Sequence, residues 1–343
     1  MDAAQPASRR PRLTPAIADI RRAVRELLAT IQGVDAVLVG LSGGADSLAL
    51  AAATAFEAPR AGIRAGAVII DHGLQADSAD VAARAAEQAR ALGLDPVIVR
   101  HVVVAAADGV AEGETYAGPE AAARTARYAA FGDAMAEAGA SHVLLAHTLD
   151  DQAETVLLGL ARGSGAASLK AMAPSNGRYL RPLLPIRREQ TRQACSDAGL
   201  DPWNDPQNGD PAYARVRVRE RVLPTLEAEL GPGIAEALAR TAEQLREDSD
   251  ALDAMIVETV EDICEHAEAG IAISVTALEA NPAALRNRII RYVVLSEFGI
   301  ALERVHVTAA IRLVTDWHGQ KPLDLPGVRV KRESGMLVFQ ARD

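Results

Sequence analysis

The chain has 343 residues, of which 49% are apolar, and a formal net charge of −10. This length predicts two domains, and the negative balance argues against indiscriminate binding of polyanions. No apolar run reaches the ~20 residues of a membrane span, no secretory leader is visible, and the two cysteines form no CxxC pair that would indicate an iron–sulfur or structural zinc site. We therefore expect a globular protein of the reducing cytoplasm with no membrane partner.

Residues 1–14 predict a disordered tail, and an amphipathic helix follows over 15–32. The stretch VDAVLVGLSGGADSLALAAATA (34–55) then combines a buried parallel strand, a glycine turn and a helix. Such a turn presents backbone N–H groups to a phosphate, and its glycines admit an anion without a Cβ in the way. It is neither a GxxxxGK[ST] nor a GxGxxG sequence. The expected nucleotide-binding residues are Ser42, Gly43, Gly44, Ala45, Asp46 and Ser47.

Asp46 would be out of place beside a phosphate unless a divalent cation lay between them, so it predicts a Mg²⁺ contact. The plainer alternative is an ordinary helix start, in which Ser42 or Asp46 is the N-cap and the glycines only make a tight turn.

Farther along, strands and helices alternate. A second strand (67–70) ends in Asp71-His72-Gly73, a helix covers 78–94, and a third strand covers 95–104. A glycine-containing segment (104–118) is a candidate mobile loop, followed by a helix (119–140) and a fourth strand ending at His147. The alternation predicts an α/β fold with a doubly wound parallel sheet, whose ligands bind at the carboxyl ends of the strands. The glycine turn, Asp71, His72 and His147 should therefore share one rim.

Three carboxylates, Asp150, Asp151 and Glu154, open the next helix, and Asp150 and Glu154 share a face at i,i+4 spacing. Acidic residues in a first turn suit the helix dipole, and Thr148 or Asp150 could simply cap the helix. Beside a nucleotide site, however, the same groups can hold Mg²⁺ or receive a cationic substrate. Both interpretations stay open at this point.

The remaining chain predicts a flexible loop (162–180), a helix from Arg188, a basic helix after the turn at 204–206, and a long acidic helix (234–267). Helices over 282–297 and 303–317 and strands within 323–340 follow. The change near residue 230 predicts a catalytic domain over 15–229 and a smaller α+β domain over 230–343. Arginines cluster in 9–25 and 215–221, which is compatible with one face that touches nucleic acid, although solvated arginine faces are commoner.

Taken together, several motifs resemble those of the bacterial tRNA(Ile)-lysidine synthetases, a family of N-type ATP pyrophosphatases. They are SGGADS (42–47), DHGLQ (71–75), RTARY (124–128), AHTLDDQAET (146–155), LARGSG (160–165), RPLL (181–184), WNDPQN (203–208) and RVRVRERVLP (215–224). The resemblance covers about residues 34–225. Thr148 stands where the family often has a second histidine, so it receives no catalytic role, and the final strands are only loosely similar.

The resemblance implies a Rossmann-like fold, ATP and Mg²⁺ as cofactors, and tRNA(Ile) with a CAU anticodon and free L-lysine as partners; it allows a homodimer. ATP would adenylate the C2 oxygen of the wobble cytidine and release diphosphate. The ε-amine of lysine would then attack C2 and release AMP, and the lysidine-containing tRNA would read AUA as isoleucine. The target base must leave the anticodon stack to be reached.

The resemblance also implies roles for individual residues. The N–H groups of Gly43 and Gly44, with Ser42 and Ser47, would hold the leaving diphosphate, and Asp46 with Asp151 would place Mg²⁺ on it. Arg124 and Arg127 would reach phosphate or the target nucleotide, and Asp71 and His72 would lie at the adenine or ribose. Asp150, Asp151 or Glu154 would receive the lysine ammonium, and a carboxylate or His147 would take its proton. The expected tRNA phosphate contacts are Arg187, Arg188, Arg215, Arg217 and Arg219.

Two other classes stay open. A tRNA thiolase with the same loop usually needs paired cysteines, whereas Cys195 and Cys264 lie on different segments. A non-catalytic nucleotide- or RNA-binding protein would have no need of the carboxylates at 150–154. An amidating synthetase would need an ammonia source, and no glutaminase segment is visible.

Overall fold

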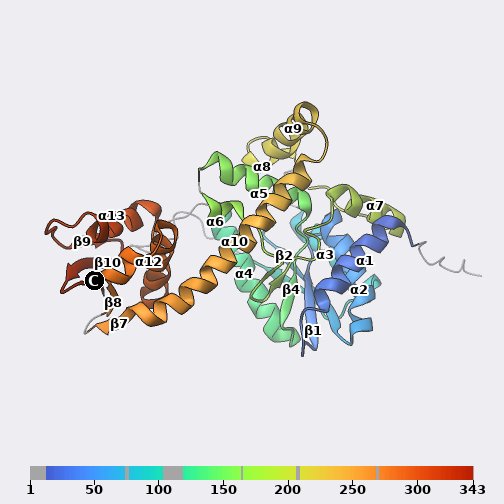
Figure 1. Cartoon of the computed structure of the whole chain (residues 1–343). Helices are drawn as coiled ribbons and strands as arrows, with labels where there is room; N and C mark the ends of the chain where they lie inside the picture. The colour runs from blue at the N-terminus through green and yellow to red at the C-terminus, as the bar shows by residue number, and fades with distance from the viewer. Residues whose placement is uncertain are drawn as a thin grey trace, which may run out of the picture. The chain divides into compact units, whose positions relative to one another are not determined.

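A six-stranded sheet forms the centre of the first part of the chain (Figure 1). Its strands are β1 (Ala36–Gly40), β2 (Arg64–Asp71), β3 (Val97–His101), β4 (His142–Leu144), β5 (Ser175–Asn176) and β6 (Tyr179–Leu180). They are ordered β3-β2-β1-β4-β6-β5, and every neighbouring pair is parallel except β5 with β6. The predicted doubly wound sheet is confirmed, since the strand order reverses at β1.

The computed structural model describes residues 13–73, 77–102, 119–163, 165–205, 209–267 and 270–342. Two expected segments lie outside these residues. They are residues 1–12 of the tail expected over 1–14, and the whole loop expected over 104–118. The chain divides into two compact units, the first ending at Gln244 and the second beginning at Leu245. Among the described residues, no helix is long and apolar enough to cross a membrane.

Helices cover both faces of the six-stranded sheet because alternate residues of its strands point to opposite sides. Val37 and Val39 of β1 belong to a buried cluster with α1 (Pro15–Leu28), α2 (Ala45–Glu57), α3 (Ser78–Ala91) and α7 (Arg188–Ala198). Leu38, on the other face, belongs to a cluster with Phe131 and Met135 of α4 (Pro119–Ala138). Each face of the sheet is therefore buried against helices.

The segment after β4 carries the acidic motif on α5 (Leu149–Ala161), which begins with a capping box between Thr148 and Asp151. The flexible loop predicted over 162–180 was wrong in part, because α6 (Ala166–Leu169), β5 and β6 lie within it. These elements are too short to leave a periodic pattern in the sequence. The basic segment forms α8 (Ala214–Arg217), the π-helical turn η4 (Val218–Val222) and α9 (Leu223–Leu230).

The helix α10 (Ile234–Ile263) contains the boundary between the two units, which therefore lies later than the change of composition near residue 230. The second unit contains an antiparallel sheet ordered β7-β8-β11-β10-β9. Its elements are β7 (Cys264–Ala267), β8 (Gly270–Ser274), α11 (Val275–Ala280), α12 (Ala283–Phe298), α13 (Arg304–Thr315), β9 (Leu323–Leu325), β10 (Val328–Glu333) and β11 (Met336–Ala341). The predicted α+β class of this unit is confirmed, although β7, β8 and α11 were not predicted.

Candidate active site

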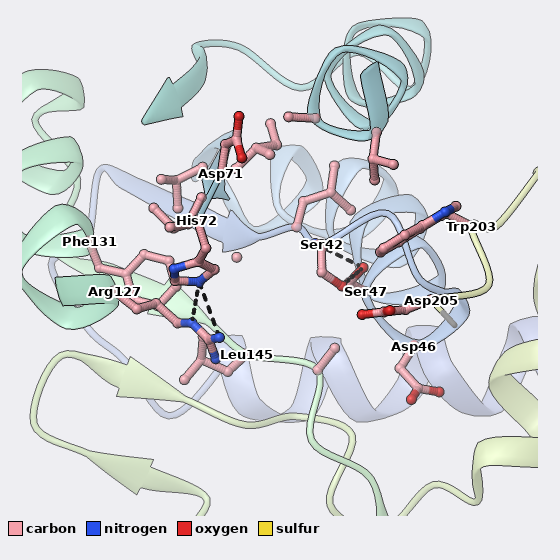
Figure 2. A pocket seen from close by; sticks show the side chains of 18 of the residues that line it. Ser42, Asp46, Ser47, Asp71, His72, Arg127, Phe131, Leu145, Trp203 and Asp205 are labelled. Atoms are coloured by element: carbon pink, nitrogen blue, oxygen red, sulfur yellow. Dashed lines mark hydrogen bonds between the residues drawn. The ribbon is translucent and has the colours of Figure 1, made fainter. Parts of the chain in front are cut away.

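A cavity of about 450 Å³ lies at the carboxyl ends of β1 and β2, beside the segment that follows β4. Figure 2 shows polar side chains on two opposite sides of it. The loop side comprises Ser42, Asp46, Ser47, Trp203 and Asp205, and the β2 side comprises Asp71, His72 and Arg127. This cavity therefore lies at the edge of the sheet where the sequence predicts that the strands end.

The glycine turn on the loop side has the geometry of an anion site. Gly43 has φ +84°, a conformation that residues with a Cβ rarely adopt, and Gly44 precedes α2 without a side-chain cap. The Ser47 hydroxyl donates to the Gly44 carbonyl at 2.9 Å and lies 3.1 Å from the Ser42 hydroxyl. Since neither Ser42 nor Asp46 caps the helix, its first N–H groups are available to a phosphate.

Asp71 and His72, on the β2 side of the cavity, both have a lowered pKa. Although burial would raise the pKa of Asp71, hydrogen bonds from the Gly73 amide and the Ser78 hydroxyl hold it below its usual value. The Arg127 guanidinium donates to His72 Nε2 at 3.2 and 3.3 Å (Figure 2). Burial and this cation lower the pKa of His72, so the ring is neutral and Nε2 is an acceptor.

His147 also lines the cavity, in the segment between β4 and α5. Burial lowers the pKa of His147 to about 4, against the opposing influence of Asp151. Its Nδ1 atom is buried and has no hydrogen-bond partner among the described residues. The imidazole is therefore neutral at physiological pH, and its lowered pKa makes it a weak base there.

Asp151 is held through both carboxylate oxygens. Its Oδ2 accepts from the Thr148 amide at 2.8 Å and from the Thr148 hydroxyl at 2.9 Å, and its Oδ1 accepts from Arg188 at 2.8 Å. Burial acts to raise the pKa of Asp151, but Arg188 and the Thr148 amide lower it overall. Thr148, and not Asp150, caps the helix.

Glu154 is fully buried and contacts three arginines. Arg188 donates to it at 3.1 Å, Arg219 at 2.8 and 3.2 Å, and the Arg215 Nε lies 3.3 Å away. The π-helical turn η4 begins between Arg215 and Arg219, and both side chains reach Glu154. Three guanidinium groups therefore surround this buried carboxylate within the folded unit.

Asp46 joins this cluster to the glycine turn. Its Oδ1 accepts from the Thr191 hydroxyl, and its Oδ2 lies 3.6 Å from Arg188 Nε. Burial raises the pKa of Asp46, and Thr191 and Arg188 offset that effect in part. The structure thus brings Asp46, Asp151, Glu154 and Arg188 together, as well as Asp150, whose Oδ2 accepts from the Arg188 amide at 2.7 Å.

Three of the predicted arginines lie elsewhere. Arg124 is exposed against the ring of Tyr128, and Arg217 is exposed and donates to the Pro211 and Ala212 carbonyls at 2.7 Å. Arg187 lies 3.3 Å from Asp150 and 3.4 Å from Glu236. Of these, Arg217 has the geometry of a surface phosphate contact.

Sequence reasoning gave no role to Trp203, Asp205 or Thr191. The first two lie in the WNDPQN motif, part of which (206–208) is outside the described residues, and both line the cavity. The Trp203 amide donates to the Gly43 carbonyl at 2.9 Å. The motif was visible in the sequence, but nothing in its residues indicates that this segment of the chain contacts the glycine turn.

Comparison with known families gives two matches. Residues 17–226 match the model of the PP-loop domain, and residues 273–338 match that of the TilS substrate binding domain. A tRNA(Ile)-lysidine synthase of Leifsonia xyli subsp. xyli is 62% identical over 304 residues, covering 88% of this chain and 89% of that protein. One of Thermobifida fusca is 50% identical over 330 residues, covering 95% and 98%.

Among solved structures, the U34-tRNA thiolase NcsA of Methanococcus maripaludis has a TM-score of 0.55 at 20% identity. The alignment covers 68% of this chain and 80% of that one. At this identity the likeness concerns the fold alone. The two cysteines of this chain, Cys195 of α7 and Cys264 of β7, are free and lie in separate units.

Proposed function

The chain belongs to the tRNA(Ile)-lysidine synthase family, and we propose that it ligates free L-lysine to C2 of the wobble cytidine of a tRNA(Ile) with a CAU anticodon. The reaction consumes ATP and yields AMP, diphosphate and the lysidine that reads AUA. The observation that carries this proposal is the direct contact between Asp46 of the glycine turn and the arginine that binds Asp151 and Glu154. A nucleotide site and a site for a cationic amine are thereby adjacent within one unit.

The first step activates the base. The cytidine O2 attacks the α-phosphorus, and the bond from that phosphorus to the diphosphate breaks in line with the attack. The Gly43 and Gly44 amides with the Ser42 and Ser47 hydroxyls stabilise the charge that grows on the diphosphate. Asp71 and His72 bind the adenosine end, and Arg127, already oriented by His72, reaches phosphate or the incoming nucleotide. Arg124, exposed at the same helix, would guide the nucleotide inward.

Magnesium fits the loop side. Asp46 and the hydroxyls of Ser42 and Ser47 are hard oxygen donors, and among the described residues no group of three or more His, Cys, Asp or Glu side chains could hold a metal ion by itself. Mg²⁺ commonly binds through one or two carboxylates plus substrate phosphates, which matches this donor set. The ion would neutralise the diphosphate charge. Asp46 is the stronger candidate for holding it, since Asp46 lines the cavity and Asp151, the second residue expected, does not.

The second step adds lysine. Its ε-nitrogen forms a bond to C2 while the bond from C2 to the AMP oxygen breaks, and the nitrogen loses protons on the way. The carboxylates of Asp150, Asp151 and Glu154 would attract the ammonium, and a carboxylate or His147 would take its proton. Arg217 and the second unit, whose residues 273–338 match the TilS substrate binding domain, would contact the tRNA.

The test is ATP–diphosphate exchange measured with and without a tRNA(Ile) transcript. We expect exchange to require the transcript, because the activated oxygen belongs to the base. Equal exchange without tRNA would contradict the proposal. An undiminished rate of exchange with a transcript that has uridine in place of the wobble cytidine would also contradict it.

A further inference from the structure

Tyr213, the residue directly before α8, presents its ring to solvent. The residue is 48% exposed, and it belongs to none of the buried apolar clusters of the described residues. A single exposed tyrosine needs no explanation by itself. Its backbone, its charged neighbours and its distance from the active site therefore decide whether this ring has a role.

The backbone that carries Tyr213 is fixed by a set of hydrogen bonds. The Tyr213 amide donates to the Asp210 carbonyl at 3.2 Å, and the Ala212 amide donates to Asp210 Oδ1 at 2.8 Å. The Arg217 guanidinium donates to the carbonyls of Pro211 and Ala212 at 2.7 Å each. A residue held in this way loses little further backbone freedom when its ring meets a ligand, so the entropic cost of binding is low.

The surface around Tyr213 is basic. Tyr213 and Arg217 share a face of the helix at i,i+4 spacing, and Arg217 and Arg221 are both exposed. Within residues 214–222 there are four arginines and one carboxylate, that of Glu220. An exposed ring among arginines is typical of surfaces that bind unpaired nucleotides, because the rings stack on bases and the cations meet phosphates.

This surface adjoins the candidate active site. Arg215 follows Tyr213 by two residues, which span at most about 7 Å of chain. Its guanidinium donates to the Thr155 hydroxyl of α5 at 3.0 Å, and α8 lies beside α5 (Figure 1). The charge of Arg215 also acts on His147, which lines the cavity. A strand whose target nucleotide occupies the cavity would therefore have its neighbouring nucleotides close to Tyr213.

The chemistry of the proposed function leaves a base without one of its stacking partners. The target cytidine has to leave the stack before its O2 reaches the α-phosphorus, and the next nucleotide in the strand then exposes the face that had packed on it. A flat aromatic ring can cover such a face whichever base it belongs to. The loss of one base–ring stack typically weakens binding by about 5- to 150-fold.

We propose that Tyr213 stacks on a nucleotide next to the wobble cytidine and covers the base face that the departure of the cytidine exposes, while Arg217 and Arg221 meet the adjoining phosphates. This inference rests on the proposed function and deepens it, since it names the residue that holds the opened anticodon loop. Stacking differs from a phosphate contact in one measurable respect. The ring releases no counterions, so the contact that it makes does not depend on salt.

The experiment compares Tyr213→Ala, Tyr213→Leu and Tyr213→Phe with Leu230→Ala, a control at another exposed side chain, at the end of α9. The Kd for a tRNA(Ile) transcript is measured at several salt concentrations, and urea titrations establish that each variant is folded. For Tyr213→Ala and Tyr213→Leu we expect a Kd raised about tenfold, with the salt slope and the Kd for ATP unchanged. Tyr213→Phe, which keeps the ring, and Leu230→Ala should bind as the wild type does.

Transcripts with an abasic residue directly before or directly after the wobble cytidine identify the stacked base. One of them should bind the wild type about as weakly as the intact transcript binds Tyr213→Ala, and the two losses should not add when they are combined. This result would distinguish a stack on that base from a general effect of the substitution on the surface.

Three results would overturn the inference: wild-type affinity in a folded Tyr213→Ala, a reduced salt slope in that variant, or losses that add with both abasic transcripts. If Tyr213→Ala does not fold, wild-type affinity in a folded Tyr213→Leu would overturn it equally. Failure of the proposed function itself would look different, since the wild type would then form no lysidine on the intact transcript, whatever its affinity.

Discussion

The backbone amide of Trp203 donates to the carbonyl of Gly43 at 2.9 Å, although the two residues come from distant parts of the chain. This bond holds the Gly43 peptide, because its carbonyl accepts from the 201–205 segment. The same segment is fixed to α3, where Gln88 exchanges two hydrogen bonds with the backbone of Asp201. The glycine turn is therefore held by a hydrogen bond from the 201–205 segment as well as by those of its own serines.

Gly43→Ala should weaken nucleotide binding, because φ +84° costs a residue with a Cβ about 1–2 kcal/mol and the turn can relieve that strain only by changing its shape. Gly62→Ala is a matched control, since Gly62 also has positive φ (+74°) and no atom within 4 Å of an added Cβ. Both variants should lose similar unfolding free energy in denaturant titrations. Only Gly43→Ala should show a raised Kd for ATP, and equal ATP affinity in the two would argue against the turn as the phosphate site.

Glu154→Gln should damage both stability and lysine use. The side chain is fully buried and compensates Arg188, Arg215 and Arg219, so removal of its charge should cost roughly 3–5 kcal/mol of unfolding free energy. The KM for lysine should rise, because an anionic partner for the ammonium is lost. Glu137→Gln, at an exposed pair with Arg100, should cost at most about 1 kcal/mol. A stable Glu154→Gln enzyme with an unchanged lysine KM would remove Glu154 from the amine site.

His147 should make the stability of the first unit depend on pH in a defined direction. Its pKa is lowered to about 4 by burial, from an ordinary 6.5, so the unfolded chain binds more protons between these values. The contribution of the neutral ring to the free energy of unfolding is fully present above pH 6.5. It declines by up to about 3 kcal/mol as the pH falls toward 4. Urea titrations of wild type and His147→Gln from pH 4 to 7 should show the difference, and parallel curves would contradict the burial of a neutral ring.

Arg217→Ala should weaken tRNA binding and reduce its salt dependence. The guanidinium is exposed and, among the described residues, donates to the carbonyls of Pro211 and Ala212, which leaves other N–H groups able to meet a phosphate. The slope of log K against log salt should fall by about 0.7–0.9 for one lost contact. Arg64→Ala is the control, at an exposed arginine that begins β2 and so lies at the other end of the strand from the cavity. An unchanged slope for Arg217→Ala would exclude a phosphate contact there.

The order of strands and helices was predictable because each parallel strand is a short apolar run followed by an amphipathic helix. The position of the cavity followed, since parallel strands end at one edge. The short strands β5 and β6 were not predictable, because two residues carry no periodicity. The same holds for β7, β8 and α11, which are short and weakly patterned.

The candidate site was predictable only in its residue types. The sequence identified Asp46, Asp151, Glu154 and seven arginines as functional candidates, but ion pairs between distant segments leave no pattern. Arg188 and Arg219 therefore entered as tRNA contacts, whereas the structure pairs them with Glu154. Thr191 and Trp203 were missed for the same reason, since each acts by a contact with a residue far away in the chain.

Mass spectrometry of tRNA(Ile) after incubation with the protein, Mg²⁺, ATP and lysine tests the central claim most directly. We expect the anticodon fragment to gain the mass of one lysine less water in the wild type, and to gain none with Asp46→Ala, which should remain folded. An anticodon fragment of unchanged mass with the folded wild type, or the full gain with Asp46→Ala, would contradict the account.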